Sequence, residues 1–142
     1  MKKVKDILEV KGHDVWSIEA DALVYDAMKL MADKGIGALL VMEGTRLVGI
    51  ISERDYARKI ILQGRSSHST KVREIMTSRV IYTEPGQNID ECMALMTEKR
   101  IRHLPVVEGG RLSGVISIGD LVKAIIAEQK FIIEQLERYI SS

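Results

Sequence analysis

An internal repeat constrains this chain more than any other feature of its sequence. Residues 14–62 align with residues 79–127 without a gap, and over a third of the aligned positions are identical. Such self-similarity at a fixed period is typical of two copies of one structural unit. One copy of roughly 50 residues is too small to bury a stable core alone, so the two copies are expected to fold together.

Each copy predicts the same order of elements, which is strand–helix–strand–strand–helix. The last helix is expected to begin at Ser52 in the first copy and at Ser117 in the second, and Asn88 with Glu91 predicts a capping box before the second copy's first helix. The opening strands are expected over 15–18 and 80–83, followed by a helix over 23–34 and its counterpart from Ile89. Two hairpin strands are expected over 38–42 and 47–51, with a turn at Gly44, and the second copy repeats this hairpin with a turn at Gly109-Gly110.

Composition limits the partners and the compartment of this 142-residue chain. A hydrophobic fraction of 46% supports a real core, and 21 Lys and Arg residues against 20 Asp and Glu residues leave a net charge of +1. That balance gives no electrostatic reason to expect a nucleic-acid or membrane partner. A single cysteine and the lack of a signal peptide or a 20-residue apolar run predict a cytoplasmic protein.

Three segments follow from the repeat and from a polar linker over Gln63–Thr70. They are repeat 1 over residues 1–66, repeat 2 over residues 67–127 and an amphipathic helix over residues 128–142. The apolar face of that tail predicts docking on its own domain or on a second subunit. Upstream of the aligned region, Val4–Leu8 echoes Val72–Met76, with about three extra residues near Glu9–Gly12.

One repeated motif contains residues that could bind a ligand. It has the form glycine, two apolar residues, serine, any two residues and aspartate. It stands at Gly49–Asp55 and at Gly114–Asp120. An ionised aspartate accepts hydrogen bonds from both hydroxyls of a ribose, and a helix start offers N–H groups to a phosphate. Glycine lets a base or sugar approach the strand. The alternative is a purely structural motif in which Ser52 or Ser117 caps the helix, and the two roles are compatible.

Two copies of this motif, with matching elements, resemble the cystathionine-β-synthase-type (CBS) domain, which occurs in tandem pairs called Bateman modules. The resemblance covers about Val4 to Ala127. It implies an α/β (α+β) fold in which two β-α-β-β-α repeats pack about a pseudo-twofold axis. It also implies clefts that bind adenosine-containing ligands such as AMP, ADP, ATP, NAD or S-adenosylmethionine.

In the family, the motif aspartate holds the ribose and the serine lies near ribose or phosphate, while backbone of the opposite copy contacts adenine. Carried over to this chain, the Asp120 cleft is completed by Lys11–Trp16 and the Asp55 cleft by Thr77–Ile81. The resulting ligand-binding candidates are Asp120, Ser117, Gly119, Arg102, His103, Lys11, Gly12, His13, Val15 and Trp16, and in the other cleft Asp55, Ser52, Arg54, Gly37, Ala38, Thr77, Ser78, Val80 and Ile81.

The two clefts are expected to differ in their charge. Arg102 and His103 are phosphate candidates in the second copy, where the first copy has Gly37 and Ala38. Because successive strand residues point to opposite faces, one of the two basic side chains is expected to face the cleft. Arg54 is either a phosphate ligand of the Asp55 cleft or an exposed arginine.

The remaining unusual residues favour structural roles. Trp16 is expected to pack in the core rather than stack on a base, and Cys92 to be a buried small side chain rather than a nucleophile. His68 lies in the linker without a role. A methionine stripe formed by Met28, Met31, Met93 and Met96 predicts core or a dimer surface.

These features predict a non-enzymatic sensor of adenosine-containing ligands that acts by itself or on a regulated protein partner. The chain is also expected to form a homodimer. The alternative is a ligand-free dimerisation or scaffold module. An enzyme is disfavoured because three histidines and one cysteine supply neither a nucleophile–base pair nor a metal cluster. No catalytic cofactor and no metal are expected.

Overall fold

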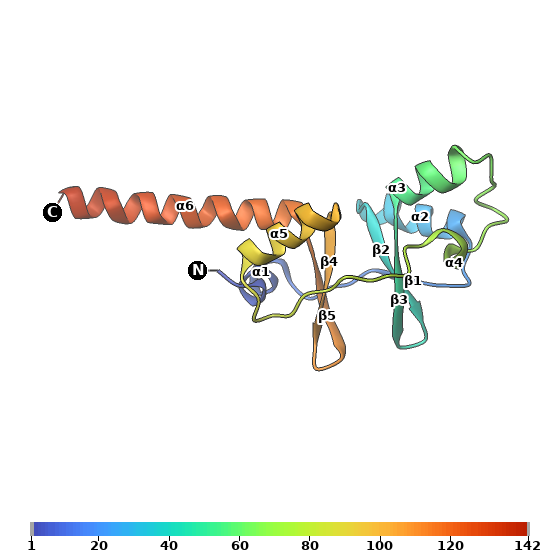
Figure 1. Cartoon of the computed structure of the whole chain (residues 1–142), viewed down its shortest axis with the longest axis horizontal. Helices are drawn as coiled ribbons and strands as arrows, with labels where there is room; N and C mark the ends of the chain where they lie inside the picture. Colours follow the sequence, from blue (N-terminus) through green and yellow to red (C-terminus); the bar gives the residue numbers. More distant parts are fainter. Residues whose placement is uncertain (1, 142) are drawn as a thin grey trace. The chain divides into compact units, whose positions relative to one another are not determined.

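The computed structural model describes residues 2–141, which form two compact units (Figure 1). Of the described residues, unit 1 contains residues 2–14 and 81–141, and unit 2 contains Val15–Val80. The segments that precede the two repeats are thus exchanged: residues 2–14 pack with the second repeat, and residues 67–80 pack with the first. The helices and strands of both units confirm the mixed α/β class.

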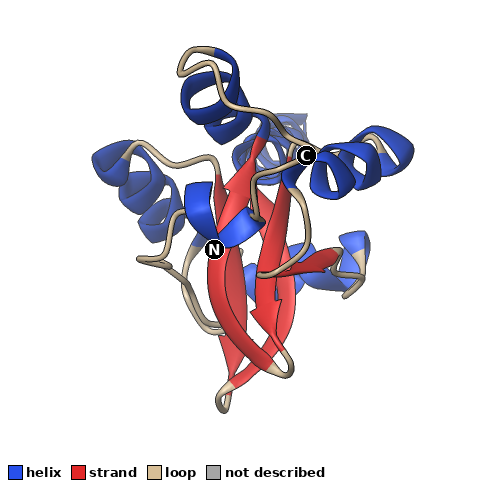
Figure 2. Cartoon of the chain, turned by 90° about the vertical axis from the view of Figure 1, so that its right-hand side faces the viewer, coloured by secondary structure: helices blue, strands red, loops and turns tan. Residues whose placement is uncertain are grey.

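Unit 2 is built on a three-stranded sheet in the order β1-β2-β3. Strand β1 pairs in parallel with β2, and β2 and β3 form the expected antiparallel hairpin, drawn in red in Figure 2. A core of Val24, Met31, Leu39 and Ile51 lies between the sheet and the helices. The elements of unit 2 are β1 (Ser17–Glu19), α2 (Val24–Lys34), β2 (Ala38–Glu43), β3 (Arg46–Ser52), α3 (Glu53–Tyr56), the π-helical turn η1 (Ala57–Ile61) and α4 (Val72–Ile75).

Unit 1 repeats this plan with one strand fewer. Its core includes Leu8, Met96, Leu104 and Ile116. Its elements are α1 (Val4–Lys11), α5 (Ile89–Lys99), the antiparallel pair β4 (His103–Glu108) and β5 (Arg111–Ser117), and α6 (Ile118–Ser141), which joins the last predicted helix and the predicted tail helix into one helix of 24 residues.

The strand predicted over residues 80–83 is wrong, because only Thr83 pairs, as a single bridge to Val106. In unit 2 the corresponding ladder includes a hydrogen bond from the Leu40 N–H to the Trp16 carbonyl. The residue equivalent to Leu40 is Pro105, which has no N–H to donate. The proline therefore shortens the ladder in unit 1.

The capping box predicted at Asn88 is also wrong. The Asn88 side chain caps no backbone N–H and instead donates to Glu91 at 3.4 Å. The N-terminal segment supplies the partners here, because Lys3 bridges to Asn88 and the Ile89 N–H donates to the Lys2 carbonyl at 3.2 Å.

The glycines of the motif are explained by the exchanged segments rather than by room for a ligand. A Cβ on Gly114 would lie 2.8 Å from a methyl carbon of Leu8, on α1. A Cβ on Gly49 would lie 2.6 Å from the sulfur of Met76 and 2.9 Å from the Thr77 carbonyl oxygen, just after α4. The expectation that these glycines admit a base or sugar is corrected accordingly.

Candidate functional site

In the motif of the second repeat, Ser117 and Asp120 form reciprocal hydrogen bonds at the start of α6. The Asp120 carboxylate oxygen Oδ2 accepts a hydrogen bond from the Ser117 N–H at 2.8 Å, and the Ser117 hydroxyl accepts one from the Asp120 N–H at 3.1 Å. This reciprocal pair satisfies N–H groups at the helix start that would otherwise lack partners. The capping role of the motif is therefore present, and it holds the carboxylate in place.

Lys11 is the cation that the fold brings to this carboxylate. Its ammonium lies 2.8 Å from Asp120 Oδ2 and donates to the Val115 carbonyl at 2.7 Å. Helix α1 has eight residues where its counterpart α4 has four, so the extra residues near Glu9–Gly12 form the additional turn that carries Lys11 to β5.

Asp120 is held as an anion. Burial raises the pKa of its carboxyl, but the hydrogen bonds from Lys11 and Ser117 together outweigh burial and bring the pKa below its usual value. Among the described residues, the hydrogen bonds to this carboxylate reach Oδ2, which leaves Oδ1 to accept from a ligand. The side chain is 20% exposed, so a ligand can reach it.

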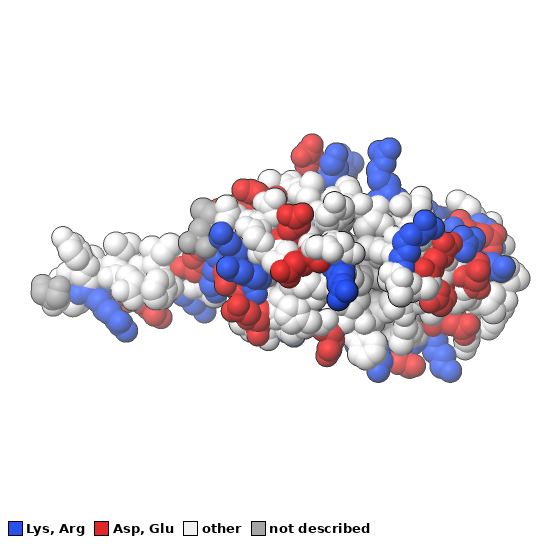
Figure 3. All heavy atoms as spheres, turned by 90° about the horizontal axis from the view of Figure 1, so that it is seen from below, with Lys and Arg blue, Asp and Glu red and all other residues white. Residues whose placement is uncertain are grey.

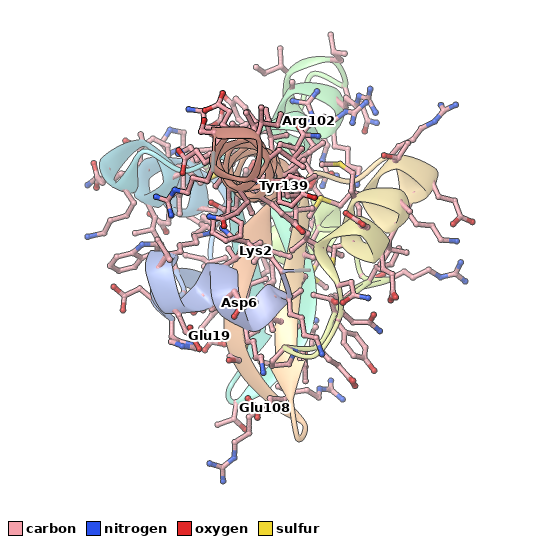
Figure 4. All side chains as sticks on the ribbon, turned by 90° about the vertical axis from the view of Figure 1, so that its left-hand side faces the viewer. Lys2, Asp6, Glu19, Arg102, Glu108 and Tyr139 are labelled. Carbon is pink, nitrogen blue, oxygen red and sulfur yellow. The ribbon has the colours of Figure 1, made fainter. Side chains whose placement is uncertain are left out.

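His103 lies within electrostatic range of this carboxylate, and Arg102 precedes His103 in the chain. His103 faces Ser117 across the β4–β5 ladder, so the two side chains share one face of the hairpin. Arg102 precedes β4, is exposed, and its carbonyl accepts from the Ile118 N–H at 2.9 Å. Figure 4 labels Arg102 and Glu108 at the two ends of this strand. Of the two basic residues, His103 is the one that shares the face of Ser117.

The His103 imidazole is held neutral. Burial lowers its pKa, the positive charges of Lys11 and Arg102 add to this effect, and only Asp120 opposes it. These influences show that Lys11, Asp120 and Arg102 each lie within electrostatic range of His103.

The lowered pKa of His103 predicts a loss of stability in mild acid. As the pH falls below about 6.5, the ordinary histidine pKa, the unfolded chain takes up the proton before the folded chain does, so folding weakens. We expect the melting temperature to fall between pH 7 and pH 5, and to fall less steeply in His103→Gln. His68→Gln, in the linker, is the matched comparison. Equal slopes in wild type and His103→Gln would contradict this assignment.

The other candidates from the N-terminal segment divide between the units. Gly12 ends α1 with φ 96°, and His13 Nδ1 lies 2.8 Å from the Ser113 carbonyl, both in unit 1 with Asp120. Val15 and Trp16 belong to unit 2.

The prediction that Trp16 packs in the core is wrong. Its side chain is 44% exposed, and the Lys34 ammonium lies 4.2 Å from the ring centroid. Trp16 precedes β1 rather than lying within it, so its ring is not directed into the core by strand alternation.

The motif of unit 2 is built alike but paired differently. Asp55 Oδ2 accepts from the N–H of Ser52 at 3.0 Å and from its hydroxyl at 3.1 Å, while Oδ1 lies 3.2 Å from the Lys59 ammonium. Lys59 also donates to the Ile75 carbonyl at 2.8 Å. Both oxygens of Asp55 are thus engaged, and this side chain is only 14% exposed.

Sequence reasoning missed Lys59, although its signal was available. It stands four residues after Asp55, which places the two side chains together on a helical turn. The second acceptor of the Lys11 ammonium, the Val115 carbonyl, had no such local signal.

The remaining candidates of the Asp55 cleft surround its motif only in part. Thr77 pairs with Ile50 of β3, and the Gly37 carbonyl accepts from the Glu53 N–H at 3.0 Å. Ala38 faces Ser52 across the hairpin. Ser78 and Val80 belong to the same unit, and Ile81 belongs to unit 1. Arg54 is exposed on α3.

The cysteine, the linker histidine and the core methionines occupy structural positions. Cys92 is 1% exposed, as predicted, and burial raises its pKa although Thr83 opposes this. Within residues 2–141, no three His, Cys, Asp and Glu side chains are grouped to hold a metal, and no helix is long and apolar enough to cross a bilayer. His68 stacks on Tyr25 with 4.2 Å between ring centroids, and Met31 and Met96 are core residues.

The sequence model of the CBS domain matches this chain twice, over residues 4–62 and 72–127. The chain belongs to the CBS-domain family. CBS-domain pairs are regulatory modules that often bind adenosine-containing ligands. Each of the two capped motifs of this chain lies within one of the two matched ranges.

Known CBS-domain proteins resemble the chain along most of its length. The CBS domain-containing protein CBSX3, mitochondrial, of Arabidopsis thaliana is 43% identical and is matched over 96% of this chain and 71% of its own. The structure of a signal-transduction protein with CBS domains from Burkholderia ambifaria has 58% identity and a TM-score of 0.87, and the match covers 90% of this chain and 96% of that one.

One similar CBS pair was solved with ligands. The CBS domain pair of the protein MJ0100, in complex with 5′-methylthioadenosine and S-adenosyl-L-methionine, is 25% identical with a TM-score of 0.79. The match covers 90% of this chain and 98% of that one. Both of its ligands contain adenosine.

Proposed function

We propose that this CBS-domain chain is a non-enzymatic regulatory module whose motif carboxylates bind the ribose of an adenosine-containing ligand, namely AMP, ADP, ATP or NAD. The observation that carries the proposal is Asp120, an anion fixed by Ser117 and Lys11 with one oxygen left to accept. Hydrogen bonds from ribose hydroxyls to a carboxylate are of the strong, charge-assisted kind.

The phosphate preference of the Asp120 site comes from its cations. Lys11 places positive charge at the carboxylate, Arg102 adds positive charge within electrostatic range of His103, and His103 adds a neutral donor on the same face as Ser117. An anionic ligand gains from these charges, whereas plain adenosine does not. The Asp120 site is therefore proposed to favour phosphorylated adenosine.

The Asp55 site is proposed as the weaker of the two. Both of its carboxylate oxygens are engaged, and Lys59 is held between Asp55 and the Ile75 carbonyl. Gly37 and Ala38 supply neither a charge like that of Arg102 nor a donor like the neutral His103 imidazole. Arg54 is the remaining cation that an anionic ligand could recruit there.

The module is further proposed to be cytoplasmic, to work as a homodimer and to pass ligand occupancy to a regulated protein. The second candidate function is a ligand-free scaffold. It is favoured by the capping geometry, because Ser117 and Asp120 already stabilise the start of α6 without any ligand.

A thermal-shift panel separates the two functions. A ligand at about 100 times its dissociation constant stabilises the folded state by roughly 2.7 kcal/mol, which for a chain of this size raises the melting temperature by several degrees. We expect such a rise with at least one of millimolar AMP, ADP, ATP and NAD, and none with inorganic phosphate at the same ionic strength. An unchanged melt with all four would favour the scaffold.

A further inference from the structure

Helix α6 carries an apolar stripe away from the core of its own unit. Its two buried residues, Leu121 and Ala124, lie in the first third of the helix, and the part that follows is surface. Figure 1 shows this helix, in orange and red, running past the other elements of unit 1. Every third or fourth residue along one side forms the stripe: Val122, Ile126, Gln129, Ile133, Leu136 and Ile140.

The stripe is comparable in size to the largest apolar patches of monomeric proteins, which often mark interaction sites. Its apolar members are between 43% and 79% exposed. With the neighbouring Ile132 they present on the order of 600 Å² of apolar surface, against roughly 800 Å² per partner in a standard protein interface. In Figure 3 the projecting helix is mostly uncharged on the side in view.

We infer that this stripe pairs with the same stripe of a second copy, with the two α6 helices antiparallel. Spacings that alternate between four and three residues are those of a helix seam. When Gln129 of one copy faces Ile133 of the other, Ile126 faces Leu136 and Val122 faces Ile140. The stripe is therefore complementary to itself, as a twofold interface requires.

Charge complementarity favours the antiparallel direction. In this pairing Lys123 of each copy falls beside Glu137 of the other, because both lie on the same flank of the stripe. Two ion pairs form by symmetry, and Lys130 is the one charged residue of this flank that meets its own equivalent. In a parallel pair the residues beside Lys130 and Glu137 are isoleucines, so no ion pairs form. Antiparallel helix dipoles also attract.

The pairing is tested with spin-label distances on the full chain, with labels at Lys130→Cys or at Arg138→Cys. The native Cys92 is buried and resists labelling. In the antiparallel pair, equivalent labels are offset along the axis by about 3 Å at position 130 and by about 21 Å at position 138. We expect a short distance at the first position and a longer one at the second. Short distances at both positions, or none at either, would overturn the inference.

Light scattering on matched variants supplies a second readout that needs no ligand. Ile133→Glu, in the stripe, should weaken the dimer at least tenfold. Phe131→Glu should leave it intact, because Phe131 is similarly exposed but lies on the opposite side of the helix. A dimer that survives Ile133→Glu would overturn the inference, whatever the outcome of the ligand experiments.

Discussion

Replacing Leu8 with alanine should lower the free energy of unfolding by about 3 kcal/mol, since truncating a buried leucine removes apolar contacts and leaves a cavity. Leu8 is 1% exposed and belongs to the core of unit 1, where it lies against Gly114. The loss should appear as a lower urea midpoint, because residues 2–14 are part of this unit although they precede the first repeat in sequence.

The same helix provides the control. Val10 is 92% exposed, so Val10→Ala should leave the urea midpoint near that of wild type. Gly114→Ala alone should lower the free energy of unfolding, because the added methyl group crowds Leu8. The loss should be smaller when Leu8 is already alanine, so the two substitutions should show a coupling free energy on the order of 1 kcal/mol. Equal effects of Leu8→Ala and Val10→Ala would show that α1 is not docked on β5.

The repeat predicted most elements because the periodicity of apolar residues is a local property. The hairpins around Gly44 and Gly109 and the helices before them appear where the pattern puts them. The short opening strand failed because one residue, Pro105, changes which hydrogen bonds the sheet can form. That reason was readable in the sequence only once the register was known.

The candidate sites could be predicted in part. The Ser–Asp geometry follows from three-residue spacing at a helix start, and this spacing is visible in the sequence. The pairing of Lys11 with Asp120 depends on a contact across more than a hundred residues, which no local pattern encodes. The extra turn of α1 was visible only as a three-residue mismatch between the repeats.

Replacing Asp120 with alanine should weaken AMP binding by roughly ten- to a hundredfold, because a charge-assisted hydrogen bond contributes on the order of 1.5–3 kcal/mol. The variant also removes the partner of Lys11, so a melting curve without ligand is needed to confirm that it folds. Arg102→Ala should weaken AMP more than adenosine, since it removes charge near the phosphate and leaves the ribose contact in place.

Asp55→Ala is the matched control for this prediction. It removes the equivalent carboxylate and cap from the other repeat, so its cost to the fold should be similar. Its effect on the tighter AMP site should be smaller, because both oxygens of Asp55 already have partners within the chain.

Calorimetric titration of AMP into wild type, Asp120→Ala and Asp55→Ala tests the central claim most directly. The account predicts saturable binding to wild type, a tight site that survives in Asp55→Ala, and its loss or severe weakening in Asp120→Ala. Loss of the tight site in Asp55→Ala with Asp120→Ala unchanged would contradict the choice of site. Wild-type protein that takes up neither AMP nor ADP, ATP or NAD would contradict the binding function itself.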